Sequence, residues 1–561
     1  MKRKVLVIGL DGATFDLIKP WAEEGKLPLF SRLMRESSWG PLRSVLQPYT
    51  AQAWSSFITG KNAGKHGIFD FLMRDFRTYG FRLVNAASRA GDSIWRILSL
   101  RGKRVIVVNV PMTYPPEEVN GILISGRDTP GMDADYSFPR EVKRELETAL
   151  GGYVIVPNDW LYMRRDRPDR AREELFREID IRFASTRYLL SKYPWDFCIL
   201  VITATDGAAH FFWRYHDPKH PLYDPVDGAK YGRTIYDVYR RIDNELEALL
   251  CDLDEETTLV MLSDHGSGPI HNRAIHLNLW LEREGFLTFQ KMRGPSMPAR
   301  LFRSGKELLY SLLPFQTLTK VRTLLPNKIR SHIFSQTLFP DVEWSKTKAY
   351  SEEFRGHIWI NLKGRDPQGI VEPGTEYEKV REEIVSRLSE LRDPETGERL
   401  LVGVHRRENL HEGPFLENLP DLIVEARGTP AIFRPRSEKG IQPPVRILTK
   451  EEMNSFETSG SHLLHGMFLI KGKGIKAGNE MKGAQIVDLA PTILYLLGES
   501  IPKDMDGRVL KGVFEPRFLA SNPMTFEDIE PEERTDYGLG AYTEKEKREI
   551  EERLKGMGYL G

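Results

Sequence analysis

The sequence predicts a layered α/β/α sandwich, in which helices cover both faces of a mostly parallel central sheet and one cap segment is inserted. The first observation is a set of short apolar runs rich in Val, Ile and Leu. The second is that helical patterns lie between these runs, because strands that alternate with helices build a parallel sheet. The third is that acidic residues and histidines follow several runs, at the strand ends where functional groups of such sheets gather.

The predicted strands are short and almost wholly apolar, which is typical of strands buried on both faces of a sheet. Polar residues or glycines bound each run, and each strand is expected to end there. In chain order the strands cover residues 5–10, 104–110, 197–203, 258–263, 422–425 and 467–470.

Two helical patterns are the clearest. Residues 230–250 place apolar side chains along one stripe, as a helix that packs on a sheet does. The stripe consists of Ile235, Val238, Tyr239, Ile242, Leu246 and Leu249. Residues 486–497 form a second helix, in which Pro491 predicts a kink or a restart because proline lacks an N–H group.

Residues 1–515 are expected to form one catalytic domain, interrupted by a basic helical insert at about 291–345. Between 291 and 332 the insert holds nine lysines and arginines against one acidic residue, Glu307. We interpret it as amphipathic helices that cap the sheet; peripheral contact with an anionic membrane or another polyanion is the alternative. Residues 516–561 form a tail, where the capping-box spacing of Thr543 and Glu546 predicts a terminal helix over 543–555.

The overall composition excludes several classes of protein. The 561 residues carry a formal net charge of +0, so no general attraction to nucleic acid is expected. Only Cys198 and Cys251 are present, which excludes a disulfide framework and fits a reducing compartment. No apolar run approaches the roughly 20 residues of a spanning helix, and the run at the N-terminus is too short for a signal peptide. The cytoplasm is the expected location, and the oligomeric state stays open.

Several short stretches carry residues suited to chemistry. Asp206 and His210 are four residues apart, so on a helix they share a face and can chelate one ion. His462 follows Gly460 and Ser461, which we expect to form a permissive loop that lets the histidine reach inward. Each stretch alone fits a structural role, such as an aspartate that caps a helix. Together they supply three aspartates, three histidines and one hydroxyl, the ligand set of a two-metal site with a threonine nucleophile: Asp11, Thr50, Asp206, His210, Asp264, His265 and His462.

The order and spacing of these stretches resemble the alkaline phosphatase superfamily, and most of all its type I phosphodiesterase/nucleotide pyrophosphatase branch. In that branch a nucleophilic threonine stands nine residues before a Thr-Gly pair, and His-Gly-Ile follows. Here Thr50 precedes Thr59-Gly60, and residues 66–68 read His-Gly-Ile. Residues 485–492 resemble the closing helix of the family, so the resemblance covers most of residues 1–510 apart from the insert.

The resemblance implies how the ligands are shared between two metal ions. One metal would be bound by Asp206, His210 and His462. The other would be bound by Asp11, Asp264 and His265, with Thr50 as its fourth ligand. Zinc suits such mixed histidine and carboxylate ligands, and manganese is the alternative. The implied activity is hydrolysis of a small phosphate ester through a phosphothreonine intermediate.

The contacts to the substrate are less well defined by the sequence. The backbone N–H of Ala51, at a predicted helix start, is one candidate for binding a phosphate oxygen. Where many nucleotide pyrophosphatases have an asparagine that contacts the phosphate, this chain has Phe71, preceded by Asp70. The resemblance therefore does not imply that this chain shares the nucleotide specificity of those enzymes. Asp70 would repel a dianionic ester or pair with a base, and the alternative phosphate contacts are Lys65, Asn109 and Arg127.

Two other functions fit the same residues. The first is a phosphomutase, or a transferase of phosphate-bearing head groups, within the same superfamily. The second is a non-catalytic metal-binding scaffold, against which the complete set of reactive residues argues. Transfer products distinguish the first alternative from hydrolysis, and metal content tests the second.

Overall fold

The computed structural model describes residues 3–290, 339, 342–352, 355–427, 432–433, 443–528 and 542–557. Most of the predicted basic insert, residues 291–338 and 340–341, lies outside the described residues. The helices predicted for it and its contact with membranes therefore stay predictions. No helix among the described residues is long and apolar enough to cross a membrane.

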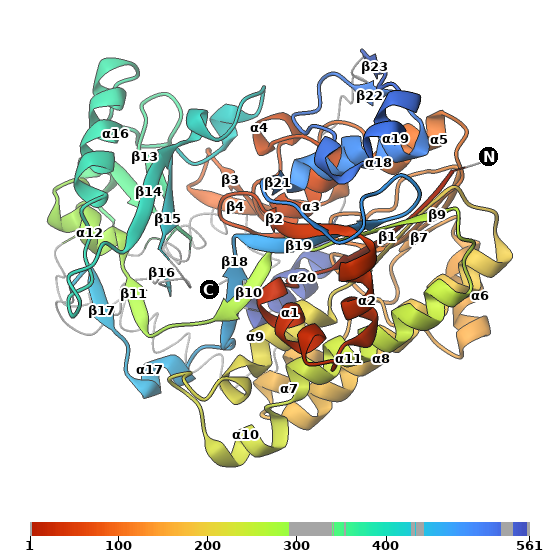
Figure 1. The fold of residues 1–561 in the computed structure, drawn as a ribbon. Coiled ribbons are helices and arrows are strands. Elements are labelled where there is room, and N and C mark those ends of the chain that lie inside the picture. The colour runs from red at the N-terminus through yellow and green to blue at the C-terminus, as the bar shows by residue number, and fades with distance from the viewer. Residues whose placement is uncertain are drawn as a thin grey trace.

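A ten-stranded, mostly parallel sheet forms the centre of the molecule (Figure 1). Its middle strand β1 runs parallel to β8 on one side and to β9 on the other. The antiparallel strands β19 and β2 extend one side of the sheet, and β7 ends the other. Across the sheet the strands are β20 (Asn479–Glu480), β2 (Ser38–Arg43), β19 (His465–Lys471), β9 (Thr257–Leu262), β1 (Lys4–Leu10), β8 (Phe197–Ile202), β5 (Val105–Val110), β6 (Gly121–Ser125) and β7 (Ser137–Phe138), with β21 (Ala484–Gln485) paired to β2.

Helices cover both faces of this sheet, which confirms the predicted sandwich (Figure 1). One layer contains α1 (Phe15–Glu23), α2 (Pro28–Glu36), α8 (Pro168–Lys192), α9 (Ala204–His216) and α11 (Thr234–Cys251). The other contains α3 (Thr50–Thr59), α5 (Ile94–Leu100) and α18 (Leu489–Leu497). The structure therefore has two apolar layers, one on each side of the strands.

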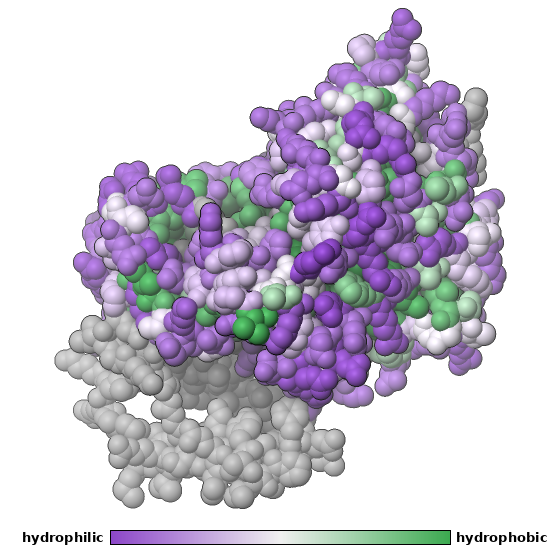
Figure 2. All heavy atoms as spheres, turned by 60° about the horizontal axis from the view of Figure 1, so that its bottom comes forward, coloured by the Kyte–Doolittle hydropathy of each residue, from purple (hydrophilic) through white to green (hydrophobic). Residues whose placement is uncertain are grey.

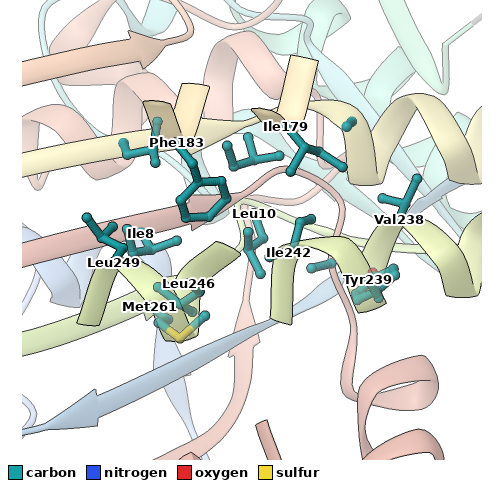
Figure 3. Close-up of a cluster of buried hydrophobic side chains, with 14 of the residues drawn as sticks. Ile8, Leu10, Ile179, Phe183, Val238, Tyr239, Ile242, Leu246, Leu249 and Met261 are labelled. Carbon is teal, nitrogen blue, oxygen red and sulfur yellow. The ribbon is translucent and has the colours of Figure 1, made fainter. Parts of the chain in front are cut away.

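The stripe predicted for residues 230–250 is buried between α11, α8 and the strands (Figure 3). All six of its apolar residues are buried, and α11 is preceded by a separate short helix, α10 (Pro225–Tyr231). In the second predicted helix, Pro491 lies in the first turn of α18, directly after a 3-10 turn at Ile486–Asp488. A first-turn residue needs no N–H partner within the helix, so proline marks a restart there.

A smaller antiparallel sheet stands beside the sandwich, with the strand order β12 (Ala349–Ser351), β13 (His357–Ile360), β15 (Leu422–Ala426) and β14 (Leu401–Arg406). Helices α12 (Leu277–Arg283) and α16 (Thr375–Leu388) pack with it. Residues 422–425 form the predicted strand, but its expected place in the parallel sheet is wrong. A short apolar run indicates a buried strand without specifying which sheet buries it.

The C-terminal residues return to the sandwich as helix α20 (Glu544–Gly556). Thr543 caps its N-terminus, and the reciprocal hydrogen bonds with Glu546 form a capping box. The apolar face of α20 packs against Ala51, Phe71 and Val84. On the surface shown in Figure 2, hydrophilic residues predominate and hydrophobic ones form small separate patches.

Candidate metal centre and active site

Three neighbouring parallel strands bring the acidic residues of the site to one edge of the sheet. Asp11 directly follows β1, Asp206 lies in the first turn of α9 after β8, and Asp264 lies two residues after β9. Because β8 and β9 both pair in parallel with β1, their carboxyl ends meet at the same place. All three carboxylates are buried.

The first group of possible metal ligands consists of Asp206, His210 and His462. Asp206 and His210 lie one turn apart in α9, and Nε2 of His210 is 3.1 Å from Oδ1 of Asp206. Nε2 of His462 lies 3.5 Å from the same oxygen and 3.0 Å from Nε2 of His210. Three potential ligand atoms thus converge on one point.

His462 lies in a strand, so the loop expected around Gly460 and Ser461 is wrong. Strand β18 (Gly460–Leu463) pairs antiparallel with β10 (Gly266–Pro269) and opposes His462 to Ser267. A Cβ atom on Gly460 would lie 2.2 Å from the carbonyl oxygen of Ala209. Glycine is therefore needed because the strand approaches the backbone of α9 closely.

The second group consists of Asp11, Asp264 and His265. Nε2 of His265 is 3.5 Å from Oδ1 of Asp11 and 3.3 Å from Oδ2 of Asp264. The rings of His265 and His462 stack with their centroids 3.6 Å apart, so the two groups are adjacent. The geometry thus offers two neighbouring ligand sets, each with carboxylate and imidazole atoms.

Thr50 stands beside the second group as the first residue of α3. Its Oγ1 is 3.4 Å from Nε2 of His265, and its side chain lines a pocket together with Asp11 and Asp206. Ala51 is the second residue of the same helix, and N–H groups of a first helical turn have no acceptor within the helix. The threonine hydroxyl thus stands at a helix N-terminus, a position that favours anion binding.

The hydrogen bonds of the histidines orient their Nε2 atoms toward the carboxylates. Nδ1 of His210, His265 and His462 is bonded to the carbonyl oxygens of Gly460, Gly266 and Pro48, at 3.0, 3.0 and 2.7 Å. A carbonyl oxygen only accepts, so Nδ1 carries the hydrogen and Nε2 is the atom that remains to bind a metal. An imidazole nitrogen and a carboxylate oxygen at such distances can share either a metal ion or a proton.

The carboxylates also favour a bound cation. Asp11 Oδ1, Asp206 Oδ1 and Asp264 Oδ2 are buried and face the Nε2 atoms of the histidines, with no other hydrogen-bond partner among the described residues. Burial, together with repulsion by Asp206, raises the pKa of Asp11 to about 8. Burial and the charges of Asp11 and Asp206 likewise raise the pKa of Asp264 well above its usual value. Buried carboxylates of this kind are stabilised by cations, so the residues fit two divalent metal ions.

Asp206 and His210 shift each other's pKa in opposite directions. Burial would raise the pKa of Asp206, but His210 and His462 outweigh burial and hold it well below its usual value. Burial would lower the pKa of His210, but Asp206 outweighs it and raises that pKa. In the first group, Asp206 therefore favours its negatively charged form and His210 its positively charged form.

The predicted substrate contacts are placed very differently from one another. Asp70 is buried in an ion pair with Arg355, the pairing that was one of its two expected roles. Asn109 donates from Nδ2 to the carbonyl oxygen of Val201 at 2.8 Å, within the sheet. Lys65 pairs with acidic side chains away from the pocket. Of these candidates only Arg127 lines the pocket beside Thr50.

Sequence reasoning missed two sets of residues. Trp54 donates from Nε1 to Oδ2 of Asp11 at 3.1 Å and so orients that carboxylate. Its position one helical turn after Thr50 was the available signal. The second set is the C-terminal wall of the pocket, formed by Tyr542, Ile550, Arg553, Leu554 and Met557. A capping box predicts where a helix starts, but nothing in it specifies the surface on which the helix packs.

The fold and the site define an enzyme of the alkaline phosphatase superfamily. The family model "Type I phosphodiesterase / nucleotide pyrophosphatase" matches residues 5–462. The chain therefore belongs to the type I phosphodiesterase/nucleotide pyrophosphatase family, and it is a phosphoester hydrolase of that type. Among curated proteins, no sequence matches this chain.

Solved structures resemble the chain over most of its length. Phosphonoacetate hydrolase from Sinorhizobium meliloti 1021, in complex with phosphonoformate, has a TM-score of 0.51 and 14% identity over 88% of this chain and 95% of that one. Human ectonucleotide pyrophosphatase/phosphodiesterase 5 has a TM-score of 0.46 and 15% identity over 89% of this chain and 96% of that one. The first likeness is one of fold.

Proposed function

We propose that the protein is a two-metal phosphodiesterase that works through a phosphothreonine intermediate. The observation that carries the proposal is the position of the Thr50 hydroxyl beside two adjacent ligand groups, at one edge of the sheet. Asp206, His210 and His462 would hold one ion, and Asp11, Asp264 and His265 the other, next to Thr50. Zinc is the expected metal and manganese the alternative. When bound, such ions lower the pKa of a nearby hydroxyl and stabilise the attacking and leaving oxygens.

The proposed reaction has two steps. In the first, Oγ1 of Thr50 forms a bond to phosphorus and gives its proton to solvent, while the bond from phosphorus to the leaving oxygen breaks and that oxygen takes up a proton and departs as the alcohol. In the second, the oxygen of a water molecule bonds to phosphorus and loses a proton to solvent, the bond to Oγ1 breaks, and Oγ1 takes up a proton, which restores the threonine and releases the phosphate monoester. In this proposal the N-terminus of α3, including the N–H of Ala51, would stabilise the equatorial oxygens.

Removal of metal tests the proposal as a whole. Treatment with a chelator is expected to abolish hydrolysis of bis-p-nitrophenyl phosphate, and zinc or manganese is expected to restore it. The purified, reloaded protein should hold about two metal ions per chain, measured by elemental analysis. Full turnover after chelation would contradict the proposal, as would less than one ion after loading. Adding small alcohols to the same assay distinguishes transfer from hydrolysis.

In this proposal Arg127 would bind the phosphate group. It lines the pocket with Thr50, and its Nη2 lies 3.2 Å from Oδ1 of Asp159, which positions the guanidinium. We expect Arg127→Ala to lower kcat/KM about a hundredfold, as loss of a preorganised donor does. Lys65→Ala is the matched control, because Lys65 pairs with Asp506 outside the pocket. Equal losses in both variants would exclude a specific role for Arg127.

A further inference from the structure

The pocket beside Thr50 has one polar end and an extended apolar side. Asp11, Thr50 and Asp206 lie at the polar end. Apolar side chains make up about half of its lining, so a substrate bound next to Thr50 would contact carbon as well as polar groups.

Two separate parts of the chain form the apolar side. Phe71, Leu83 and Val84 contribute the first wall, at the hairpin of β3 (Leu72–Asp75) and β4 (Gly80–Leu83). Ile550 and Leu554 of the C-terminal helix contribute the second wall, together with Met557 directly after its end. The spacing of four residues places Ile550 and Leu554 on one face of the helix. These side chains also belong to one buried cluster.

The C-terminal helix is held firmly in this position. Arg553 is buried and donates to the carbonyl oxygens of Thr129 at 2.9 Å and Pro130 at 2.7 Å. The ring of Tyr542 stacks on that of Tyr114, with centroids 5.7 Å apart and planes 8° apart. At the other end of the helix, a Cβ atom on Gly556 would lie 2.2 Å from the ring of Trp160. The helix is thus fixed at both ends.

The polar groups near the apolar side are engaged with the protein itself. The hydroxyl of Tyr542 donates to the carbonyl oxygen of Asp128 at 3.2 Å. The carboxylate of Asp128 accepts from the backbone N–H groups of Met112 and Tyr114, at 3.0 and 2.9 Å. The wall therefore presents mainly carbon to a substrate. A nucleobase or sugar would lose its hydrogen bonds to water there without replacing them, whereas a hydrocarbon would not.

We propose that the C-terminal helix is a specificity element, whose apolar face forms, with the β3–β4 hairpin, the subsite for a hydrocarbon group of the phosphodiester. This inference rests on the proposed function for the position of the phosphate. The substrate class is a diester in which one alcohol is an alkyl or aryl group, and nucleotides are disfavoured. Apolar burial supplies the selectivity, because each methylene removed from water favours binding.

The test compares p-nitrophenyl esters that share one leaving group. In the full, metal-loaded protein, kcat/KM for hexyl p-nitrophenyl phosphate is expected to exceed that for the methyl ester at least about tenfold. It should also exceed that for p-nitrophenyl thymidine 5′-phosphate. Leu554→Asn places an amide in the apolar wall, and Val84→Phe fills the opposite wall. Each is expected to bring the hexyl-to-methyl ratio close to one.

The ratio does not depend on the fraction of protein that folds, so reduced stability of a variant does not obscure it. Lys555→Gln, on the exposed side of the same helix, should keep the wild-type ratio. A wild-type ratio near one, a preference for the thymidine ester, or an unchanged ratio in both wall variants would overturn the inference.

Binding separates this inference from the proposed function. By calorimetry, hexylphosphonate should bind to the metal-loaded protein at least about tenfold more tightly than methylphosphonate. If no ester is hydrolysed but this difference is found, the proposed reaction fails and the subsite stands. If the esters are hydrolysed without any difference in ester preference or binding, the subsite fails and the reaction stands.

Discussion

Replacement of Thr50 by alanine is expected to lower kcat/KM for bis-p-nitrophenyl phosphate at least about a thousandfold, because loss of a nucleophile removes the whole covalent route. Thr50→Ser keeps a hydroxyl on the first residue of α3 and should retain part of the activity. Mass spectrometry of the acid-quenched wild-type reaction should detect a phosphate on Thr50, and Thr50→Ala should show none.

A second threonine in the same pocket provides the matched control. Thr203 also lines the pocket, but its Oγ1 donates to Oε1 of Glu178 at 2.6 Å. Thr203→Ala is therefore expected to cost far less activity than Thr50→Ala. Turnover of Thr50→Ala within about tenfold of the wild type would reject Thr50 as the nucleophile.

The replacement of Asp206 by asparagine is expected to remove one of the two metal ions and at least about 99% of the activity. Oδ1 of Asp206 lies close to the Nε2 atoms of both His210 and His462, so the first ligand group depends on its charge. Elemental analysis should find about one metal ion per chain in Asp206→Asn and about two in the wild type.

Asp243 is the control for replacing a buried carboxylate. It accepts hydrogen bonds from the backbone N–H groups of Leu29 and Phe30, at 3.3 and 2.9 Å, away from the metal ligands. Asp243→Asn should lower the melting temperature while the metal content stays at the wild-type level. Two ions retained in Asp206→Asn would show that the first ligand group is assigned wrongly.

The sequence was sufficient to predict helices and strands that have a clear local pattern of apolar residues. The strands that became β1, β8 and β9 are continuous apolar runs, and the stripe from Ile235 to Leu249 has helical spacing. The place of residues 422–425 was wrong because strand pairing depends on distant partners. The apolar wall of α20 was missed for the same reason, since its contact with Phe71 joins residues far apart in the chain.

Site residues with a recognisable sequence pattern were likewise predicted better than those without one. The candidate ligands were recognisable because their order and spacing resemble a known family, and the structure brings them into two groups. The proposed substrate contacts Asp70 and Asn109 had only their position in the sequence to support them. Each has a partner within the protein, an ion pair for Asp70 and a backbone carbonyl for Asn109.

The hydrogen bond from His462 to Pro48 connects metal occupancy to the order of the loop before the nucleophile. Nδ1 of His462 holds the carbonyl oxygen of Pro48, two residues before Thr50. A metal ion on Nε2 would restrict the imidazole ring and, through this bond, the backbone of that loop. Amide hydrogen exchange at residues 49–51 should consequently slow when metal is added, although none of their side chains belongs to the first ligand group. Occupancy of that group would thus be read out as rigidity of the segment that carries the attacking hydroxyl.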